Sequence, residues 1–291
     1  MLLRRNTGLS LVCLLGAILL VSSITQAQDR AEEGWRCIHP GLLLQVFKPK
    51  ARAGEERLFI SVLKIDPGEY DFHLLAVSEN GEGNKTLPQW MEAHNLHAAI
   101  NASMFWKDQR TSAGFMRNYA HVNNSYLHPK YEGFLVFNPT HPSLPEIQII
   151  DREHHSNWRK ILDRYATVVQ NFRMISLRGE NVWEQSKKKY SVASVGITHQ
   201  GKVLFIFCQT PTTIHDLNQV LLRLPLDIKT CMFVEGGPTA GLAVDVDKLS
   251  KGWKGRSENF LWPEVSSSFA RLPNVIGITP KHKEATCSDK Q

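Results

Sequence analysis

Short apolar runs rich in valine, isoleucine and phenylalanine dominate the chain from Leu58 onward, and glycine, proline and asparagine separate most of them. Runs of this length and composition, bounded by such residues, are typical of β-strands. The predicted strands are 58–65, 73–78, 97–105, 133–137, 147–150, 165–172, 191–198, 202–209, 230–237 and 274–279. The pattern therefore predicts a protein in which strands outnumber helices.

Helical periodicity is confined to three stretches. They are 87–96, a stretch that Ser156 would cap and that runs through Arg164, and 214–224. The first follows Thr86, a residue suited to an N-cap, and has a proline in its first turn. The third has Thr213 and Asp216 in capping-box positions, and Pro225 ends it. Because these helices fall between groups of strands, we expect one α+β domain with a mixed, mostly antiparallel β-sheet flanked by a few helices.

The segment 250–273 breaks the strand pattern and is rich in glycine, serine, tryptophan and proline. We expect it to form an irregular flap. Trp253 and Trp262 are expected to pack inside it rather than to stack on sugars.

The N-terminus has the order of a secretory signal peptide. Arg4 and Arg5 precede an apolar run from Leu9 to Val21, and small residues follow as far as Ala27. The alternative is an uncleaved anchor, for which the run is short. We expect cleavage after Ala27, a secreted or periplasmic protein, and no stable membrane insertion after cleavage.

Charge and cysteine content narrow the partners. The chain has 34 Lys and Arg against 28 Asp and Glu, a net charge of +6, and the only local cluster is Lys187–Lys189. So small a cluster in an exported protein is not a nucleic-acid site, whereas a basic surface suits an anionic envelope polymer or a phosphorylated sugar.

Four cysteines follow the signal segment: Cys37, Cys208, Cys231 and Cys287. They have no CxxC spacing, which disfavours a zinc site, and they leave three disulfide pairings open. The oligomeric state stays open.

No cofactor or metal is expected. The sequence has no Gly-x-Ser-x-Gly, no phosphate-binding loop and no nucleotide fingerprint. His94 with His97, and His154 with His155, have metal-like spacing, but we expect no acidic partner close to them in sequence, which disfavours zinc.

Polar side chains interrupt two of the predicted strands. Asn101 ends an apolar strand, where its amide either points into a binding site or starts a turn. Gln170, Asn171 and Arg173 interrupt another strand, and alternation places Asn171 and Arg173 on one face. The planar fork of Arg173 suits phosphate, and the alternative is an edge-strand arginine that reaches solvent.

A third strand, 230–237, ends in Glu-Gly-Gly. This places the Glu235 carboxylate at the rim of a sheet, and Gly236 and Gly237 allow close approach of a ligand or another backbone. A partly desolvated carboxyl has a raised pKa and can serve as a general acid or base. The alternative is a structural ion pair with an arginine.

The start of the third predicted helix adds His215, Asp216 and Asn218. A His–Asp pair beside a helix N-terminus can bind an anion or tune an acid. For Asp216 the alternative is capping of the helix.

The order and spacing of these segments resemble the phosphodiester glycosidase family, whose known activity removes N-acetylglucosamine from a sugar phosphodiester. The matching motifs are Asn101-Ala-Ser-Met-Phe105 with Gly114, Gln170-Asn-Phe-Arg-Met-Ile175, Ser194-Val-Gly196, Gly201-Lys-Val203 and Val234-Glu-Gly-Gly237. The chain departs from the family in three places. Glu235 replaces an aspartate, Pro238 replaces a serine, and the arginine expected near Val192 is absent. These departures mark a divergent subgroup.

The resemblance implies a family domain over 57–279, preceded by the signal peptide 1–27 and an N-terminal extension 28–56 and followed by a tail 280–291. It implies that the polar motifs converge on one cleft. Because polar groups at the ends of apolar strands are costly to bury separately, we expect the ends of the strands 98–105, 166–173 and 230–235 to meet at one rim of one sheet. The candidate catalytic residues are Glu235, Asp216 and His215. The candidate substrate-binding residues are Asn101, Gln170, Asn171, Arg173, Asn218, Gly236 and Gly237. We expect an exported hydrolase of a glycosidic or sugar-phosphodiester bond, or alternatively a non-catalytic glycan or phosphoglycan binding module.

Overall fold

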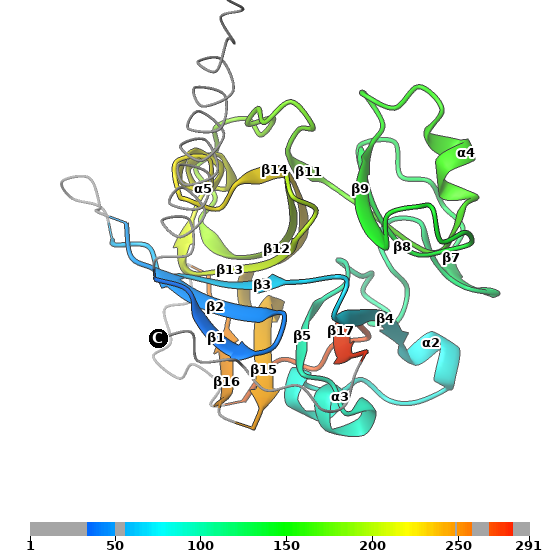
Figure 1. The fold of residues 1–291 in the computed structure, drawn as a ribbon, viewed down its shortest axis with the longest axis horizontal. Coiled ribbons are helices and arrows are strands. Elements are labelled where there is room, and N and C mark those ends of the chain that lie inside the picture. The colour runs from blue at the N-terminus through cyan, green and yellow to red at the C-terminus, as the bar shows by residue number, and fades with distance from the viewer. Residues whose placement is uncertain (1–33, 50–55, 248, 258–267, 282–291) are drawn as a thin grey trace, which may run out of the picture. The chain divides into compact units, whose positions relative to one another are not determined.

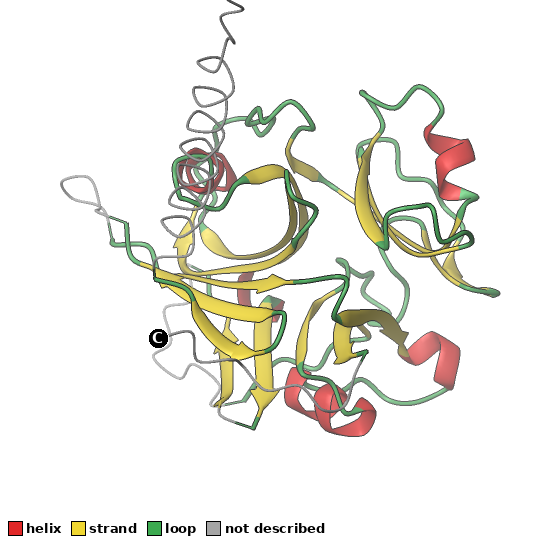
Figure 2. Ribbon diagram, viewed as in Figure 1, coloured by secondary structure: helices red, strands yellow, loops and turns green. Residues whose placement is uncertain are grey.

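The structure, a computed structural model, describes residues 34–49, 56–247, 249–257 and 268–281. The predicted signal peptide and Trp262 lie outside these residues. Strands outnumber helices in them, and every strand pairing is antiparallel (Figures 1 and 2). The α+β class with mostly antiparallel pairing is confirmed.

The strands are divided among three sheets rather than one. The seven-stranded sheet has the order β1 (Arg36–His39), β2 (Leu42–Phe47), β3 (Ile60–Ile65), β13 (Val203–Thr212), β12 (Tyr190–Thr198), β14 (Ile228–Gly236) and β11 (Arg173–Ile175). One five-stranded sheet has the order β7 (His121–Asn124), β6 (Met116–Asn118), β10 (Tyr165–Asn171), β8 (Gly133–Pro139) and β9 (Ile147–Asp151). The other has the order β16 (Leu249–Lys254), β15 (Gly241–Val246), β5 (Ala98–Asn101), β17 (Asn274–Pro280) and β4 (Tyr70–Ala76).

The expectation of three strand ends at one rim of one sheet is wrong, because β5, β10 and β14 each belong to a different sheet. The switch between two of the sheets takes place at Phe172, which is the only residue between β10 and β11. The sheets nevertheless share one apolar core, to which each contributes fully buried residues such as Leu63, Leu135 and Leu242.

In the described part of the chain, four helices flank the sheets: α2 (Val77–Asn80), α3 (Leu87–His94), α4 (Trp158–Leu162) and α5 (Ile214–Leu221). Helix α3 has the predicted Thr86 N-cap, which forms a capping box with Gln89, and it covers β5, β15 and β17 with Trp90. Helix α4 contacts β9 and β10 and packs on β8. It begins at Trp158 with Asn157 as N-cap, one residue after the predicted cap Ser156. Helix α5 has the predicted Thr213 cap but ends at Leu221, before Pro225.

Sequence patterns missed six strands: β1, β2, β6, β7, β15 and β16. Four of them, β1, β6, β7 and β16, have few consecutive apolar residues. The last of them occupies part of the segment predicted as an irregular flap, and Trp253 within it is buried in the core, as predicted for its packing role.

Cys37 is disulfide-bonded, whereas Cys208 and Cys231 are buried free thiols. In the ranges that the structure describes, no helix has the length and apolar character needed to cross a bilayer.

Candidate active site

Glu235 lies at the end of β14, beside a β-bulge. Ala193 of β12 pairs with Glu235 and Ser194 pairs with Phe233, so Val234 is an extra residue that bends the strand. The Glu235 side chain is buried, and the Gly236 N–H donates a hydrogen bond of 2.9 Å to its Oε1. Burial raises the pKa of Glu235 to about 7, although hydrogen bonds from the Gly236 N–H and the Thr239 hydroxyl oppose the shift. The carboxyl can therefore hold or release a proton near neutral pH.

Two tyrosines lie beside this carboxyl. Burial raises the pKa of Tyr131 and of Tyr190, and the negative charge of Glu235 raises both further. Both phenols therefore stay protonated at neutral pH. Within the described residues neither phenol forms a hydrogen bond, so both hydroxyls are available to a ligand. Sequence reasoning missed both tyrosines; the pairing of β12 with β14 is the one signal that would have placed Tyr190 here.

The two positions after Glu235 require glycine for different reasons. A Cβ on Gly236 would lie 2.6 Å from the Tyr190 ring, so a glycine is needed for this ring to approach the strand end. Gly237 has φ +73°, in the left-handed region that favours glycine, and it starts the 3₁₀ turn Gly237–Thr239. The Glu-Gly-Gly sequence thus allows an aromatic ring and a sharp turn directly after the carboxylate.

Asn171 and Asn101 hold the backbone on either side of Glu235. The Asn171 Nδ2 donates to the Val234 carbonyl (3.1 Å), and its Oδ1 accepts from the Phe172 N–H (2.8 Å). Asn101 in β5 donates from Nδ2 to the Thr239 carbonyl (3.0 Å), and its Oδ1 accepts from the backbone N–H of residue 241 (2.8 Å). Both side chains are buried. The two other sheets therefore fix the segment that carries Glu235 through one amide each.

Gln170 fixes the turn that carries Tyr131. Its Nε2 donates to the carbonyls of His128 (2.9 Å) and Tyr131 (2.7 Å). Its Oε1 accepts from the N–H groups of His128 (2.9 Å) and Phe115 (3.1 Å). These four bonds use the whole capacity of the amide. The side chain is fully buried and positions the turn through its backbone.

The Arg173 guanidinium is surrounded by carboxylates. Its Nη1 lies 2.7 Å from Asp151 Oδ1, and its Nη2 lies 2.6 Å from Glu132 and 2.7 Å from Glu153. Burial opposes ionisation of Asp151, but the hydrogen bond and charge of Arg173 lower the pKa of that carboxyl below its ordinary value. With three carboxylates around one buried cation, the arrangement favours a structural role for Arg173 over the phosphate-binding role expected from its sequence position.

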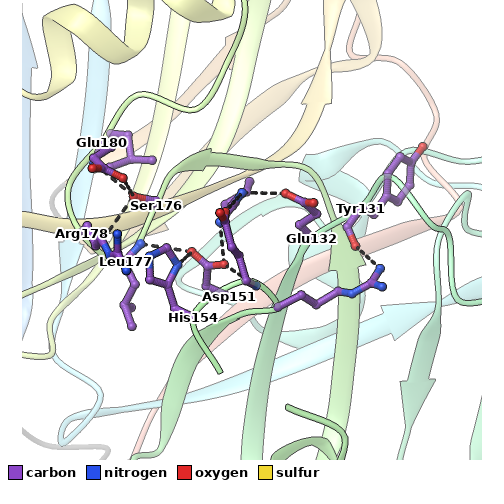
Figure 3. Close-up of polar contacts among 12 residues, drawn as sticks. Tyr131, Glu132, Asp151, His154, Ser176, Leu177, Arg178 and Glu180 are labelled. Atoms are coloured by element: carbon purple, nitrogen blue, oxygen red, sulfur yellow. Dashed lines mark hydrogen bonds and ion pairs between the residues drawn. The ribbon is translucent and has the colours of Figure 1, made fainter. Parts of the chain in front are cut away.

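Asp151 also accepts a hydrogen bond of 2.9 Å from His154, so this histidine does have an acidic neighbour (Figure 3). Within the described residues, Asp151, Glu153 and His154 form the one group with metal-like spacing, their ligand atoms lying within 4.8 Å of one another. The Arg173 cation already pairs with both carboxylates. The Tyr131 side chain points away from this network (Figure 3).

Asp216 and His215 lie at the start of α5. Thr213 Oγ1 accepts from the Asp216 N–H (3.1 Å) and donates to the Asp216 carboxylate (2.6 Å), so Asp216 takes part in the cap. His215 Nδ1 lies 3.5 Å from Asp216 Oδ1, a contact too poorly aligned to be a hydrogen bond, and its backbone carbonyl accepts from Asn181 (3.0 Å). The hydrogen bonds of this pair therefore serve the helix start and the loop before β12.

Asn218 bonds to the same loop. Its Nδ2 donates to the Met174 carbonyl (2.7 Å) and to Asn181 Oδ1 (2.8 Å). The loop continues to Trp183, whose ring centroid lies 5.9 Å from that of Phe233, two residues before the candidate acid. Helix α5 thus holds the loop that carries Trp183, and the Trp183 ring packs on Phe233 beside the candidate acid.

The candidate site therefore combines one buried carboxyl of raised pKa, two phenols, and amide side chains that fix the strand end. Residues 94–279 match the model of the phosphodiester glycosidase family, and the chain belongs to that family. This confirms the family resemblance seen in the sequence.

Two solved structures share the fold. One is the catalytic domain of zebrafish N-acetylglucosamine-1-phosphodiester alpha-N-acetylglucosaminidase, auto-inhibited by its pro-peptide, with a TM-score of 0.59, 7% identity, and coverage of 84% of this chain and 85% of that chain. The other is a hypothetical protein from Synechocystis, with a TM-score of 0.57, 12% identity, and coverage of 82% of this chain and 62% of that chain. The match thus spans less than two thirds of the Synechocystis protein. No curated protein matches the chain in sequence.

Proposed function

We propose that the protein is an exported hydrolase that cleaves a glycosidic or sugar-phosphodiester bond in envelope or secreted glycan, with Glu235 as general acid. The observation that carries this proposal is the buried Glu235 carboxyl, whose pKa is raised to about 7. A carboxyl with an ordinary pKa is ionised at neutral pH and has no proton to donate. The environment of Glu235 keeps the acid form available in the pH range where an exported enzyme works.

In the proposed reaction the Glu235 proton passes to the oxygen that links the anomeric carbon to the leaving group. The carbon–oxygen bond breaks, and a water molecule adds its oxygen to the anomeric carbon and gives up a proton, which restores the acid form. The Tyr131 and Tyr190 hydroxyls bind sugar oxygens beside the breaking bond. Asn101, Asn171 and Gln170 are positioning residues, because their amides are spent on backbone groups.

For the sugar we propose N-acetylglucosamine. The zebrafish protein that shares the fold is named for removal of this sugar from a phosphodiester. The leaving group has two candidates. Because three carboxylates neutralise Arg173, a phosphate would have to be recognised by the phenols and by backbone N–H groups. A neutral glycoside needs only the phenols and the acid.

A non-catalytic glycan-binding module remains the second candidate, favoured by the aromatic rings around Glu235. The Trp183 ring contacts the rings of Phe172 and Phe233, and the Phe172 ring also contacts Tyr131. Aromatic walls with a few polar groups are typical of sites for neutral organic ligands. Incubation of the wild-type protein and Glu235→Gln with α-linked N-acetylglucosamine glycosides and 1-phosphodiesters separates the two. Turnover that depends on Glu235 supports the hydrolase, whereas binding with no turnover between pH 4 and pH 8 supports the module.

Export is supported by two features. The order of charged, apolar and small residues before Gln28 is that of a signal peptide. Cys37 is disulfide-bonded, and disulfides persist mainly in oxidising compartments. N-terminal sequencing of the protein recovered from the medium or periplasm tests cleavage after Ala27; an intact N-terminus would contradict it.

A further inference from the structure

A strip of three rings leads outward from Glu235 along one loop. Tyr131 lies beside the carboxyl, His128 stacks on Tyr131 with centroids 3.8 Å apart and an interplanar angle of 26°, and Tyr126 meets His128 edge-on at 5.8 Å. Exposure rises along the strip: Tyr131 is 7% exposed, His128 is partly buried and Tyr126 is 52% exposed. The strip is therefore continuous from the candidate acid to solvent.

The fold holds the strip rigidly. Gln170, fully buried, bonds to the backbone of both His128 and Tyr131 with three of its four hydrogen bonds. A Cβ on Gly114 would lie 2.8 Å from the Tyr131 ring and 2.7 Å from the Gln170 carbonyl, so the ring is packed to contact on its inner side. The Asn124 side chain accepts from the Tyr126 N–H (2.9 Å). A surface that is ordered before the ligand arrives loses less entropy on binding.

The chemistry of the strip suits a neutral, flat-faced ligand. Burial and the charge of Lys130 lower the pKa of His128, so its ring is uncharged at neutral pH. Aromatic rings that stand in water gain free energy when apolar surface covers them, at about 25 cal/mol per Å². A pyranose ring presents such a surface in the C–H groups of its face, while its hydroxyls stay in contact with water.

We propose that Tyr126 and His128, in continuation of Tyr131, form a second sugar-binding subsite, so that the ligand is an oligosaccharide of at least two rings rather than one sugar on a small leaving group. This rests on the proposed function only in taking Glu235 as the point of cleavage. One sugar ring occupies the position beside Glu235, and the next stacks along the strip toward Tyr126.

The test is calorimetric binding by the exported protein carrying Glu235→Gln, which prevents turnover during titration. The probes are N-acetylglucosamine and its β-1,4-linked tetramer. We expect the tetramer to bind at least tenfold more tightly than the monomer, and the additional change Tyr126→Ala to remove most of that gain. The matched control is Tyr119→Ala, because Tyr119 is a second exposed tyrosine (61%) on the turn between β6 and β7 and is not part of the strip.

Affinities for monomer and tetramer within twofold of each other would overturn the subsite, and so would absence of tetramer binding or an equal effect of Tyr126→Ala and Tyr119→Ala. Hydrolysis by the unaltered protein is measured separately, on the α-linked N-acetylglucosamine glycosides and 1-phosphodiesters. Hydrolysis that depends on Glu235 without a length effect in binding rejects the subsite alone. Length-dependent binding without hydrolysis supports the subsite and rejects the hydrolase.

Discussion

The substitution Glu235→Gln would remove a carboxyl whose ionised form is unfavourable, because the fold buries it. Burial raises the Glu235 pKa from 4.5 to about 7. One pKa unit corresponds to about 1.4 kcal/mol, so the ionised carboxylate destabilises the folded state by about 3 kcal/mol. The cost is absent below pH 4.5, where the carboxyl is protonated in both states. It grows as the pH rises from 4.5 to about 7, because only the unfolded state ionises freely there.

Urea unfolding of the wild-type protein and Glu235→Gln at pH 5 and pH 8 measures this cost. The advantage of the variant should grow by about 2 to 3 kcal/mol between the two pH values. Glu92→Gln, which changes an exposed glutamate on α3, is the control and should show no such growth. A Glu235→Gln advantage that is the same at pH 5 and pH 8 would refute the view that burial holds this carboxyl near neutral pH.

Three further substitutions test the surroundings of the site. Arg173→Met leaves the Asp151 carboxylate buried without its cation and should lower the free energy of unfolding by about 3–5 kcal/mol in urea titrations; a loss below 1 kcal/mol would show that the network is not structural. Asn171→Leu removes the donor to the Val234 carbonyl and should lower the free energy of unfolding by about 1–3 kcal/mol. It should also lower kcat more than it raises KM. An unchanged kcat would show that this amide does not position Glu235. Gly236→Ala places a Cβ 2.6 Å from a tyrosine ring and should lower the stability measured by thermal unfolding by about 1–3 kcal/mol. Gly83→Ala, with no atom within 4 Å of its Cβ, should leave stability nearly unchanged. Equal effects of the two substitutions would contradict the packing argument.

The sequence predicted the strands that bury both faces, because apolar runs bounded by turn residues carry that information locally. It also predicted that Glu235 ends a strand, since the following glycines mark the turn. It did not predict that β5, β10 and β14 belong to three sheets, because strand partners far apart along the chain are set by register and core packing rather than by local pattern.

The local sequence pattern could not predict the role of Arg173, for the same reason. An arginine in an apolar strand fits phosphate binding as well as an ion pair, and only the fold brings Asp151 and Glu132 to it. Tyr131 and Tyr190 were missed because Tyr131 comes to Glu235 from the loop before β8 and Tyr190 from the start of β12, and neither has a motif of its own. The amides of Asn101 and Asn171 were found by position, but their partners are backbone groups that a sequence does not identify.

The central claim is that protonated Glu235 donates its proton to the leaving group, and the pH dependence of hydrolysis tests it most directly. The measurement is kcat/KM for the wild-type protein and Glu235→Gln on an α-linked N-acetylglucosamine substrate from pH 4 to pH 9. Because the acid form is active, kcat/KM of the wild type should fall about tenfold per pH unit above the Glu235 pKa of about 7. Glu235→Gln should be slower by about 10²–10⁴-fold at pH 6 and should lose that decline. A Glu235→Gln protein that keeps the wild-type rate and the wild-type pH profile would contradict the account.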